Sequence, residues 1–418
     1  MLKESTFHTH IAKQLLINGR GCAPRDFYNR RETSQPLYAA PRLTQTNYNA
    51  AGLTRKELKM NITLLHQLPP SENNPRNSEG SFIRGKQGEI LFAYSRYTGE
   101  HWGDDCACDI ALISSFDEGR TWSEPRIIAR AADFGVKNVM SVSAMELSDG
   151  SIAFFFLIKI EKDGISTIEL GRTVSKNGVD FVSERCDMKC APYYYVVNND
   201  RFVRLSSGRI VAPTAYVHRD LVNKRPFNHF TAYASSCLYS DDDGKTFFKA
   251  NLDLRSAYGP NYRTGLQEPG ILEREDGLYL WMRTNYGCQY ESFSAHGLEG
   301  FAESKPSGFT SPCSPMQIKT FGNVTYAVYN PVPNYNGRYQ APGTMGRTPF
   351  VIRKSTDGGK TFGAINIIED EETRGYSYPA LFPTNDGRLL LAYCRGDASD
   401  GCQLCRIGIS EIEIDTIE

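Results

Sequence analysis

Short apolar runs recur along this chain, and a polar residue followed by glycine precedes most of them. Five such pairs end at Gly88, Gly150, Gly208, Gly277 and Gly387, and a weaker copy contains Gly322. A polar-glycine turn followed by a run rich in branched and aromatic residues is typical of a β-hairpin. The pattern therefore predicts a chain made mainly of antiparallel strands.

A second motif lies between these hairpins and occurs three times, at residues 115–122, 240–247 and 355–362. Each copy reads Ser-x-Asp-x-Gly-x-Thr followed by an aromatic residue, and a degenerate copy lies at 175–181. The Asp and Ser side chains can bond nearby backbone amides, and glycine accepts a left-handed backbone. We therefore expect turns held by side chains, and the repetition indicates a repeat architecture.

The spacing of the turn glycines gives the number of repeats. Successive glycines from 88 to 277 lie 62, 58 and 69 positions apart, and the weak copy divides the following 110 positions to 387. Six units of this size predict an all-β, six-bladed β-propeller over residues 56–418. A strand near 58–65 would close the ring against a C-terminal strand at 406–412 and cover an exposed edge. Residues 1–55 fall outside the rhythm and are predicted to form a short, partly irregular N-terminal extension.

Composition narrows the possible functions. The formal net charge is −1 and no basic block is present, which argues against a nucleic-acid partner. The longest apolar run, 152–158, is too short to span a membrane. Residues 1–20 show no secretory signal, which favours the cytoplasm, or a secreted or periplasmic location had a leader been removed. The oligomeric state stays open.

Eleven cysteines and seven histidines raise the question of metal chemistry. Cys402 and Cys405 form a CxxC pair, but no second pair stands at zinc-ribbon spacing. His218, His229 and His296 are scattered along the chain. We therefore expect reduced thiols, and neither a metal nor a cofactor.

Five segments carry candidate chemistry. Glu268 lies fifteen positions before Arg283 across a predicted hairpin, and Arg347 lies eight positions before a turn motif. Tyr376 and Ser377 form a Tyr-Ser pair. The remaining two segments are an acidic pair, Asp104 and Asp105, ten or so positions before the first turn motif, and Arg76 before the first hairpin.

This constellation resembles the sialidase (neuraminidase) superfamily of Asp-box, or BNR-repeat, propellers from residue 60 onward. The resemblance implies that Arg76, Arg283 and Arg347 bind a substrate carboxylate, that Tyr376 is the nucleophile, and that Glu268 is its base. Asp105 would be the acid/base residue. Sialidases usually show Arg-Ile-Pro at the first arginine, where this chain has Arg76 followed by Asn and Ser, so Arg84 is a fallback.

The chemistry supports these residue types. Guanidinium groups form bidentate, charge-assisted hydrogen bonds with a carboxylate, which lysine does not match in geometry. A neutral tyrosine nucleophile avoids repulsion by the substrate's own carboxylate, and sialidases are the tyrosine exception among glycosidases. A phenol with a pKa near ~10 needs a neighbouring base.

Several alternatives stay open. Tyr378 is two residues from Tyr376 and would share its strand face, so either is the candidate nucleophile. Asp104 competes with Asp105. The residues assigned to the pocket lining are Asn198, Asn199 and Tyr290, and a buried strand or a loop explains each about equally well.

The sequence therefore predicts an exo-α-sialidase-type retaining glycoside hydrolase, acting on terminal sialic acid or a similar 2-keto sugar acid of an acidic glycan. One rival is a uronate-acting polysaccharide lyase or hydrolase, and the other is a non-catalytic glycan-binding propeller.

Overall fold

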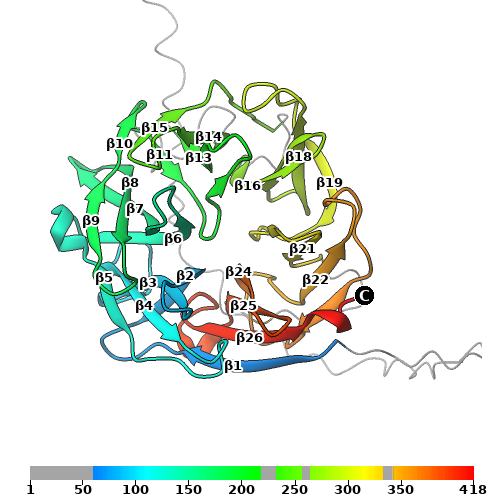
Figure 1. The fold of residues 1–418 in the computed structure, drawn as a ribbon, viewed down its shortest axis with the longest axis horizontal. Helices are drawn as coiled ribbons and strands as arrows, with labels where there is room; N and C mark the ends of the chain where they lie inside the picture. Colours follow the sequence, from blue (N-terminus) through cyan, green and yellow to red (C-terminus); the bar gives the residue numbers. More distant parts are fainter. Residues whose placement is uncertain (1–59, 218–231, 257–263, 333–340, 342) are drawn as a thin grey trace, which may run out of the picture. The chain divides into compact units, whose positions relative to one another are not determined.

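The computed structural model describes residues 60–217, 232–256, 264–332, 341 and 343–418 (Figure 1). The chain divides into two units, residues 1–56 and 57–418. The predicted extension 1–55 lies outside the described residues. The described part is all β apart from three short 3-10 helices, η1 (Ala131–Phe134), η3 (Ala398–Asp400) and η4 (Ile414–Thr416).

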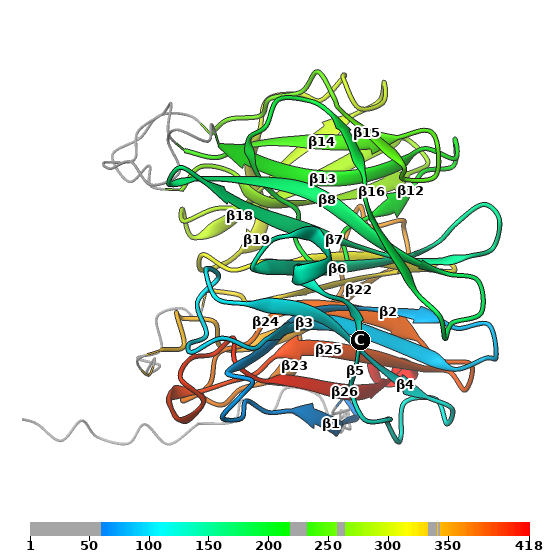
Figure 2. The same ribbon diagram turned by 90° about the vertical axis from the view of Figure 1, so that its left-hand side faces the viewer.

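The strands form a propeller-like ring of mainly antiparallel sheets, in which β2 (Arg76–Arg84), β6 (Asn138–Glu146), β16 (Gln267–Arg274) and β24 (Ser377–Pro383) lie toward the centre (Figure 1). Figure 2 shows the ring from the side, and the strands of the different sheets run in roughly the same direction there. Two four-stranded sheets illustrate the pattern, with their strands given in spatial order: β16 (Gln267–Arg274), β17 (Gly277–Arg283), β18 (Cys288–Ser294) and β19 (Lys305–Thr310); then β20 (Gln317–Phe321), β21 (Val324–Tyr329), β22 (Phe350–Ser355) and β23 (Asn366–Glu369).

A six-stranded sheet precedes these two in the chain. Within it, both β11 and β12 pair with β13, at different residues. Its strands are β10 (Asp187–Lys189), β11 (Tyr194–Val196), β12 (Val203–Arg204), β13 (Ile210–Val217), β14 (Ala234–Ser240) and β15 (Thr246–Lys249).

The largest sheet contains eight strands. Its first half holds β2 (Arg76–Arg84), β3 (Ile90–Tyr97), β4 (Cys108–Ser115) and β5 (Arg126–Ala129), and its second half holds β6 (Asn138–Glu146), β7 (Ile152–Lys162), β8 (Ile165–Ser175) and β9 (Val182–Arg185). The two halves are joined by a single parallel pair, Cys108 with Asn138. The described residues therefore form five hydrogen-bonded sheets rather than the six separate ones that the sequence predicted.

The last sheet closes the ring as predicted. β1 (Ile62–Leu68) pairs antiparallel with β26 (Ile407–Glu413), which continues through β25 (Arg388–Cys394) to the inner strand β24 (Ser377–Pro383). Strands from the two ends of the described chain thus share one sheet. The pairing covers the edge that β26 would otherwise expose.

The three repeated turn motifs have the predicted construction. In the first copy, Ser115 Oγ donates to Asp117 Oδ1 (2.8 Å), and the amides of Gly119 and Thr121 donate to Ser115 Oγ and Asp117 Oδ1 (both 2.8 Å). The copies at 240–247 and 355–362 repeat these bonds. These hydrogen bonds lower the pKa of Asp117 to about 2, against the opposing effect of desolvation.

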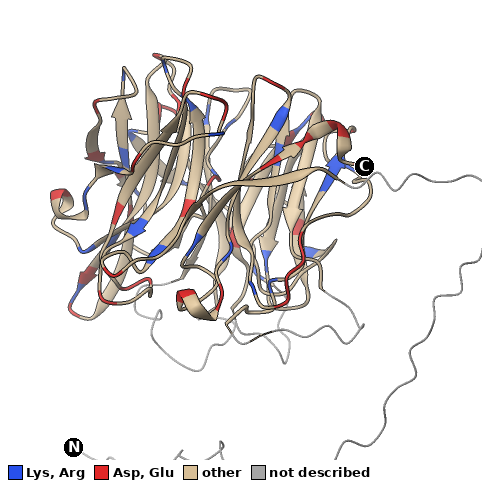
Figure 3. Ribbon diagram, turned by 90° about the horizontal axis from the view of Figure 1, so that it is seen from below, with Lys and Arg blue, Asp and Glu red and all other residues tan. Residues whose placement is uncertain are grey.

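The hydrophobic core lies between adjacent sheets. Phe155 of β7 packs in one cluster with Leu238 of β14, and Phe92 of β3 packs in another with Leu390 of β25. Lys, Arg, Asp and Glu are interspersed over the ribbon without segregation by sign (Figure 3). Within the described ranges, no helix is long and apolar enough to cross a membrane.

Candidate active site

Four inner strands carry a β-bulge at matching positions. The register shifts lie between Ser78 and Ser81, Met140 and Ser143, Gln267 and Gly270, and Ser377 and Ala380. One residue in each bulge has a left-handed backbone: Glu79 (φ 57°), Ser141 (φ 60°), Glu268 (φ 42°) and Tyr378 (φ 56°). Each such backbone conformation destabilises the fold by about 1–3 kcal/mol, and it persists only where the surrounding structure holds the residue in place.

The four bulge residues line one cavity of about 290 Å³. A bulge re-aims the side chain that it carries, and bulges are frequent beside active sites. Here four of them, from β2, β6, β16 and β24, direct two carboxyl groups, a hydroxyl and a phenol into a common space. The cavity is also lined by Asp104, Met140, Leu157, Tyr194, Tyr195, Val196, Asn198, Tyr233, Gln267, Arg283, Met345, Arg347 and Leu404.

Tyr378, Glu268 and Arg283 form a connected group at one side of the cavity. The Tyr378 hydroxyl donates to Glu268 Oε1 (3.1 Å), and Arg283 Nη1 lies 2.8 Å from the same oxygen. Burial and the Glu268 charge raise the pKa of Tyr378 well above its ordinary value, although Arg283 and Arg347 act in the opposite direction. The phenol is therefore neutral at pH 7 and has a carboxylate within reach of its proton.

Arg347 borders the same group. Its Nη1 donates to Ser377 Oγ (3.3 Å) and its Nη2 to the Cys313 carbonyl (3.1 Å), while Arg283 Nε contacts Cys313 Sγ (3.3 Å). Burial, followed by the proximity of Arg283, lowers the pKa of Arg347. Two guanidiniums thus lie side by side on Cys313 and face one cavity.

Arg76 does not line the cavity and already has partners within the protein. Its Nη2 donates to Glu79 Oε1 (2.9 Å), its Nη1 to Asp104 Oδ1 (2.6 Å), and its Nε to Ser78 Oγ (2.8 Å). Glu79 and Asp104 stand between Arg76 and the open space. The expected convergence of three guanidiniums is therefore seen for Arg283 and Arg347, whereas Arg76 reaches the cavity through two carboxyl groups.

The structure separates the two acidic candidates. Asp104 lines the cavity, while Asp105 lines a neighbouring cavity with Lys137 and Lys159. Arg76 lowers the pKa of Asp104, outweighing the upward effect of desolvation. The side chain of Asp104 is still 63% exposed, which leaves it accessible to a ligand.

Tyr376, the first choice for the nucleophile, lies away from the cavity. It is fully buried in a core cluster against Phe350 and Tyr393, with ring centroids 6.1 and 6.2 Å away. The prediction that Tyr376 and Tyr378 share a face assumed regular alternation, which the bulge at Ser377 to Ala380 interrupts. The geometry therefore favours the alternative, Tyr378.

Of the remaining candidates from the sequence, one lines the cavity and three do not. Asn198 lines the cavity, but Asn199 lies behind it and donates to the carbonyls of Gly80 (2.8 Å) and Tyr378 (3.3 Å), so it supports two bulges. Tyr290 packs on Tyr286 and is not a lining residue. Arg84, the fallback for Arg76, pairs with Glu118 within the first turn motif.

Sequence reasoning did not assign Glu79, Ser141, Tyr233, Met345 and Leu404, all of which line the cavity. Glu79 accepts from Ser141 Oγ (2.5 Å), and burial raises its pKa despite Arg76. One usable signal was a glutamate one or two positions before a glycine, at 79–80 and 268–270. A Cβ on Gly80 or Gly270 would approach Phe92 or Trp281 to 2.2 or 2.1 Å, so these bulges require glycine.

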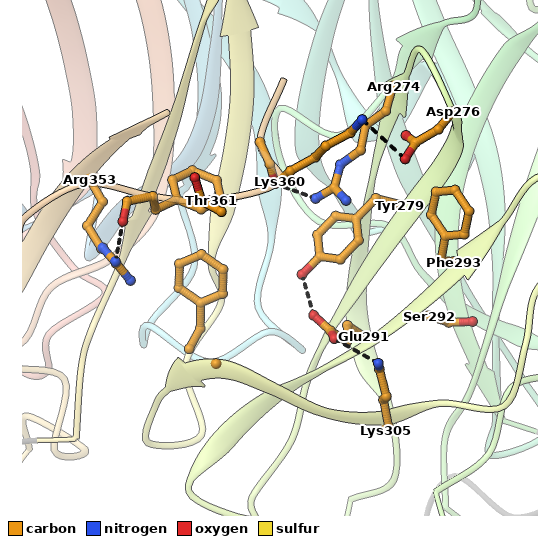
Figure 4. A pocket seen from close by; sticks show the side chains of 14 residues that line it. Arg274, Asp276, Tyr279, Glu291, Ser292, Phe293, Lys305, Arg353, Lys360 and Thr361 are labelled. Carbon is orange, nitrogen blue, oxygen red and sulfur yellow. Dashed lines mark hydrogen bonds and ion pairs between the residues drawn. The ribbon is translucent and has the colours of Figure 1, made fainter. Parts of the chain in front are cut away.

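A larger cavity of about 440 Å³ lies elsewhere, between β16–β19 and β20–β23 (Figure 4). Its polar groups have partners within the protein: Tyr279 donates to Glu291 (3.0 Å), and Lys360 and Lys305 pair with Asp276 and Glu291. The guanidiniums of Arg274 and Arg353 donate to the backbone carbonyls of Gly359 and Gly363. The larger cavity shares no lining residue with the smaller cavity. Within the described ranges, no group of three or more His, Cys, Asp or Glu side chains is arranged to hold a metal ion.

Comparison with known protein families shows to which family the chain belongs. The BNR repeat-like domain family matches residues 97–391, well over half of the sequence. The chain belongs to this family. No curated protein sequence matches it. The recognition of a sialidase-type, BNR-repeat fold from the sequence is thereby confirmed.

Solved structures share the fold at low identity. A protein of unknown function from Dyadobacter fermentans is 17% identical, with a TM-score of 0.64 over 84% of this BNR-repeat chain and 99% of its own. The Hadza microbial sialidase Hz136 is 14% identical, with a TM-score of 0.62 over 83% and 67%. The leech intramolecular trans-sialidase, solved with 2,7-anhydro-Neu5Ac, is 14% identical, with a TM-score of 0.60 over 84% and 70%.

Proposed function

We propose that this protein is a retaining glycoside hydrolase of the sialidase type, which removes a terminal sialic acid or a similar 2-keto sugar acid from an acidic glycan. The observation that carries the proposal is the 3.1 Å hydrogen bond from Tyr378 to Glu268 beside Arg283 and Arg347. A phenol hydrogen-bonded to a buried carboxylate, next to two guanidiniums in a cavity, is better explained by a catalytic role than by packing alone.

Unsatisfied polar groups support a ligand in this cavity. Glu268 Oε2, Arg347 Nε and Asn198 Nδ2 are buried and have no hydrogen-bond partner within the described protein. Buried polar atoms usually have partners, and all three of these belong to residues that line the cavity, which suits a polar ligand better than an apolar one.

The proposed reaction begins when Glu268 takes the proton of Tyr378 and the phenolate attacks the anomeric carbon. Asp104 protonates the leaving oxygen, and the tyrosyl-glycoside intermediate forms. Asp104 then takes a proton from water, whose oxygen attacks the anomeric carbon and breaks its bond to the Tyr378 oxygen. The Tyr378 oxygen regains its proton from Glu268, and the sugar leaves with retained configuration. Arg283 and Arg347 hold the substrate carboxylate.

Arg76 has a coupled role in this scheme. A substrate carboxylate that approaches Arg76 weakens its pairing with Asp104, and this removes the influence that lowers the pKa of Asp104. Substrate binding would thus favour the protonated form of Asp104, which the first step needs.

Hydrolysis of a fluorogenic α-sialoside tests the proposal. Tyr378→Phe is expected to lower kcat/KM by at least about 10³-fold, because the nucleophile is lost, and Glu268→Gln by a similar amount. Tyr376→Phe is the matched control and should keep near wild-type activity, because Tyr376 lies outside the cavity. Full activity in Tyr378→Phe would overturn the mechanism.

A uronate-acting enzyme is the second candidate, and the engagement of Arg76 by Glu79 and Asp104 favours it. With two guanidiniums facing the cavity, the site also suits a sugar whose carboxylate is not on the anomeric carbon. Incubation with polyuronates separates this candidate from the first, because a lyase yields unsaturated products that absorb in the ultraviolet and a hydrolase releases new reducing ends.

We also propose that the two halves of the eight-stranded sheet are separate blades. With the other four sheets, the propeller then has six blades. The two halves share only the pair Cys108 with Asn138, whereas strands within each half pair over many residues.

A further inference from the structure

The CxxC pair lies in a turn that touches the candidate active site. Cys402 and Cys405 are in the loop between β25 and β26, and the Cys405 amide donates to the Cys402 carbonyl (3.1 Å). Such an i to i+3 turn keeps its end Cα atoms within about 7 Å, and disulfides span about 4.4–6.8 Å. The two sulfurs are 3.6 Å apart, while a disulfide requires about 2.05 Å.

The surroundings of Cys402 favour a thiolate. The Leu404 amide donates to Cys402 Sγ (3.4 Å) and the Cys405 thiol is within hydrogen-bond distance of it. The Cys405 hydrogen bond, with help from Arg76 and Arg347, lowers the pKa of Cys402 to about 7. Cys402 is 8% exposed and Cys405 is fully buried, so Cys402 is the one that a reagent can reach.

The two residues between the cysteines contact the site. Leu404 lines the cavity beside Tyr378. Gln403 accepts from Ser377 Oγ (3.0 Å) and donates to Met345 Sδ (3.3 Å), and Ser377 is itself a partner of Arg347. A Cβ on Gly375 would lie 2.6 Å from Gln403 Cβ, so the turn is packed closely against the start of β24.

From these contacts we propose that Cys402 and Cys405 are a reversible dithiol–disulfide site whose oxidation repositions Gln403 and Leu404 and thereby changes the cavity. The oxidant is a small disulfide, RSSR. The Cys402 thiolate attacks one of its sulfurs and releases RS⁻. Cys405 then loses its proton and attacks Cys402 Sγ, forming the protein disulfide and releasing the second RS⁻. Two electrons pass to RSSR, and the two thiol protons end on two RSH molecules.

The inference does not depend on the proposed function, because it concerns thiol chemistry and local structure. The sulfurs must approach by about 1.5 Å to bond. Since the turn is short and closely packed, this movement is transmitted to the residues between them.

Titration of the full chain with oxidised glutathione tests the chemistry by intact mass. The wild type is expected to lose two hydrogen masses and two alkylatable thiols, and a reductant should restore both. Cys405→Ser should stop at a mixed disulfide on Cys402, and Cys402→Ser should form none on Cys405. Cys288→Ser, which removes a half-buried cysteine elsewhere, should still lose the two hydrogens. A wild type that keeps both thiols through the titration overturns the proposal.

Hydrogen exchange tests the link to the cavity. A peptide covering residues 375–381 is expected to differ at least about twofold in deuterium uptake between oxidised and reduced protein, and a peptide covering 165–175, none of whose residues lines the cavity, serves as reference. Disulfide formation without a change at 375–381 overturns the coupling.

Discussion

Glu79 determines how an anion reaches Arg76. Its carboxylate occupies Arg76 Nη2 and is held by Ser141, so a substrate carboxylate must compete with it. Burial raises the pKa of Glu79, and Asp104 and Glu268 raise it further, while Arg76 and Ser141 lower it. As the pH falls through this raised pKa, Glu79 gains a proton and stops competing. Anion binding should therefore strengthen toward acidic pH.

Glu79→Gln tests this competition. Where wild-type Glu79 is ionised, the variant is expected to bind an unsaturated sialic acid analogue roughly tenfold more tightly, about 1.4 kcal/mol, because Arg76 loses an ionised partner. The gain should shrink as the pH falls, since wild-type Glu79 is then protonated too. Calorimetric titration at several pH values measures it, with Glu118→Gln, which alters a carboxylate paired with Arg84, as control. Equal affinity of both proteins at every pH tested would contradict the competition.

Tyr376 gives a stability prediction at the same scale. Its hydroxyl is buried without a hydrogen-bond partner in the described protein, and burial raises its pKa. Because an unsatisfied buried hydroxyl is costly, Tyr376→Phe should leave the free energy of unfolding unchanged or increase it by up to ~1 kcal/mol. Urea unfolding measures the difference. A loss of more than that amount would show that the hydroxyl has a stabilising partner.

At the scale of elements, the turn motifs connect neighbouring sheets. An added Cβ would lie 2.7 Å from Leu390 at Gly119, 2.4 Å from Phe155 at Gly244, and 3.0 Å from Leu272 at Gly359. In each case the contact belongs to a strand of the neighbouring sheet or half-sheet. The motif therefore holds its own turn through Asp and Ser and also lets the turn dock closely on the next unit.

Gly244→Ala should reveal this docking. The backbone at Gly244 has φ 79°, and the new methyl group would meet the buried Phe155 ring. Backbone strain of about 1 kcal/mol and overpacking of about 1–3 kcal/mol add to a loss of about 2–4 kcal/mol. Gly208→Ala, at φ 88° with nothing within 4 Å, is the matched control and should lose only the strain, about 1 kcal/mol. Equal losses in denaturant unfolding would show that docking contributes nothing.

These elements also show what sequence patterns can and cannot predict. The turns at Gly88 and Gly119 follow local rules, because side-chain hydrogen bonds and positive φ are encoded within a few residues. The bulges at Glu79 and Tyr378 do not, since a left-handed backbone at a non-glycine residue depends on the packing around it. The site residues were therefore found as segments, while the choice between Tyr376 and Tyr378 required the structure.

At the scale of the whole propeller unit, one strand pair joins the ends of the described chain. β1 pairs with β26 through six residue pairs, and Leu68 of β1 is buried in a cluster with Phe82 and Phe92 of the eight-stranded sheet. Without β1, the polar backbone edge of β26 would be open to solvent or to another chain. The unit is thus expected to depend on this closure for cooperative unfolding.

Comparing a chain that begins at residue 60 with one that begins at residue 69 isolates β1. The shorter chain should unfold at a midpoint lower by at least ~5 °C, because it loses buried apolar surface and a full ladder of hydrogen bonds. A peptide of residues 60–68 added in excess should restore part of the loss in a saturable way, since it can pair with the vacant edge. Differential scanning calorimetry measures both effects, and a scrambled peptide of the same composition is the control. Identical midpoints for the two chains would mean that the ring holds together through its sheet-to-sheet contacts alone.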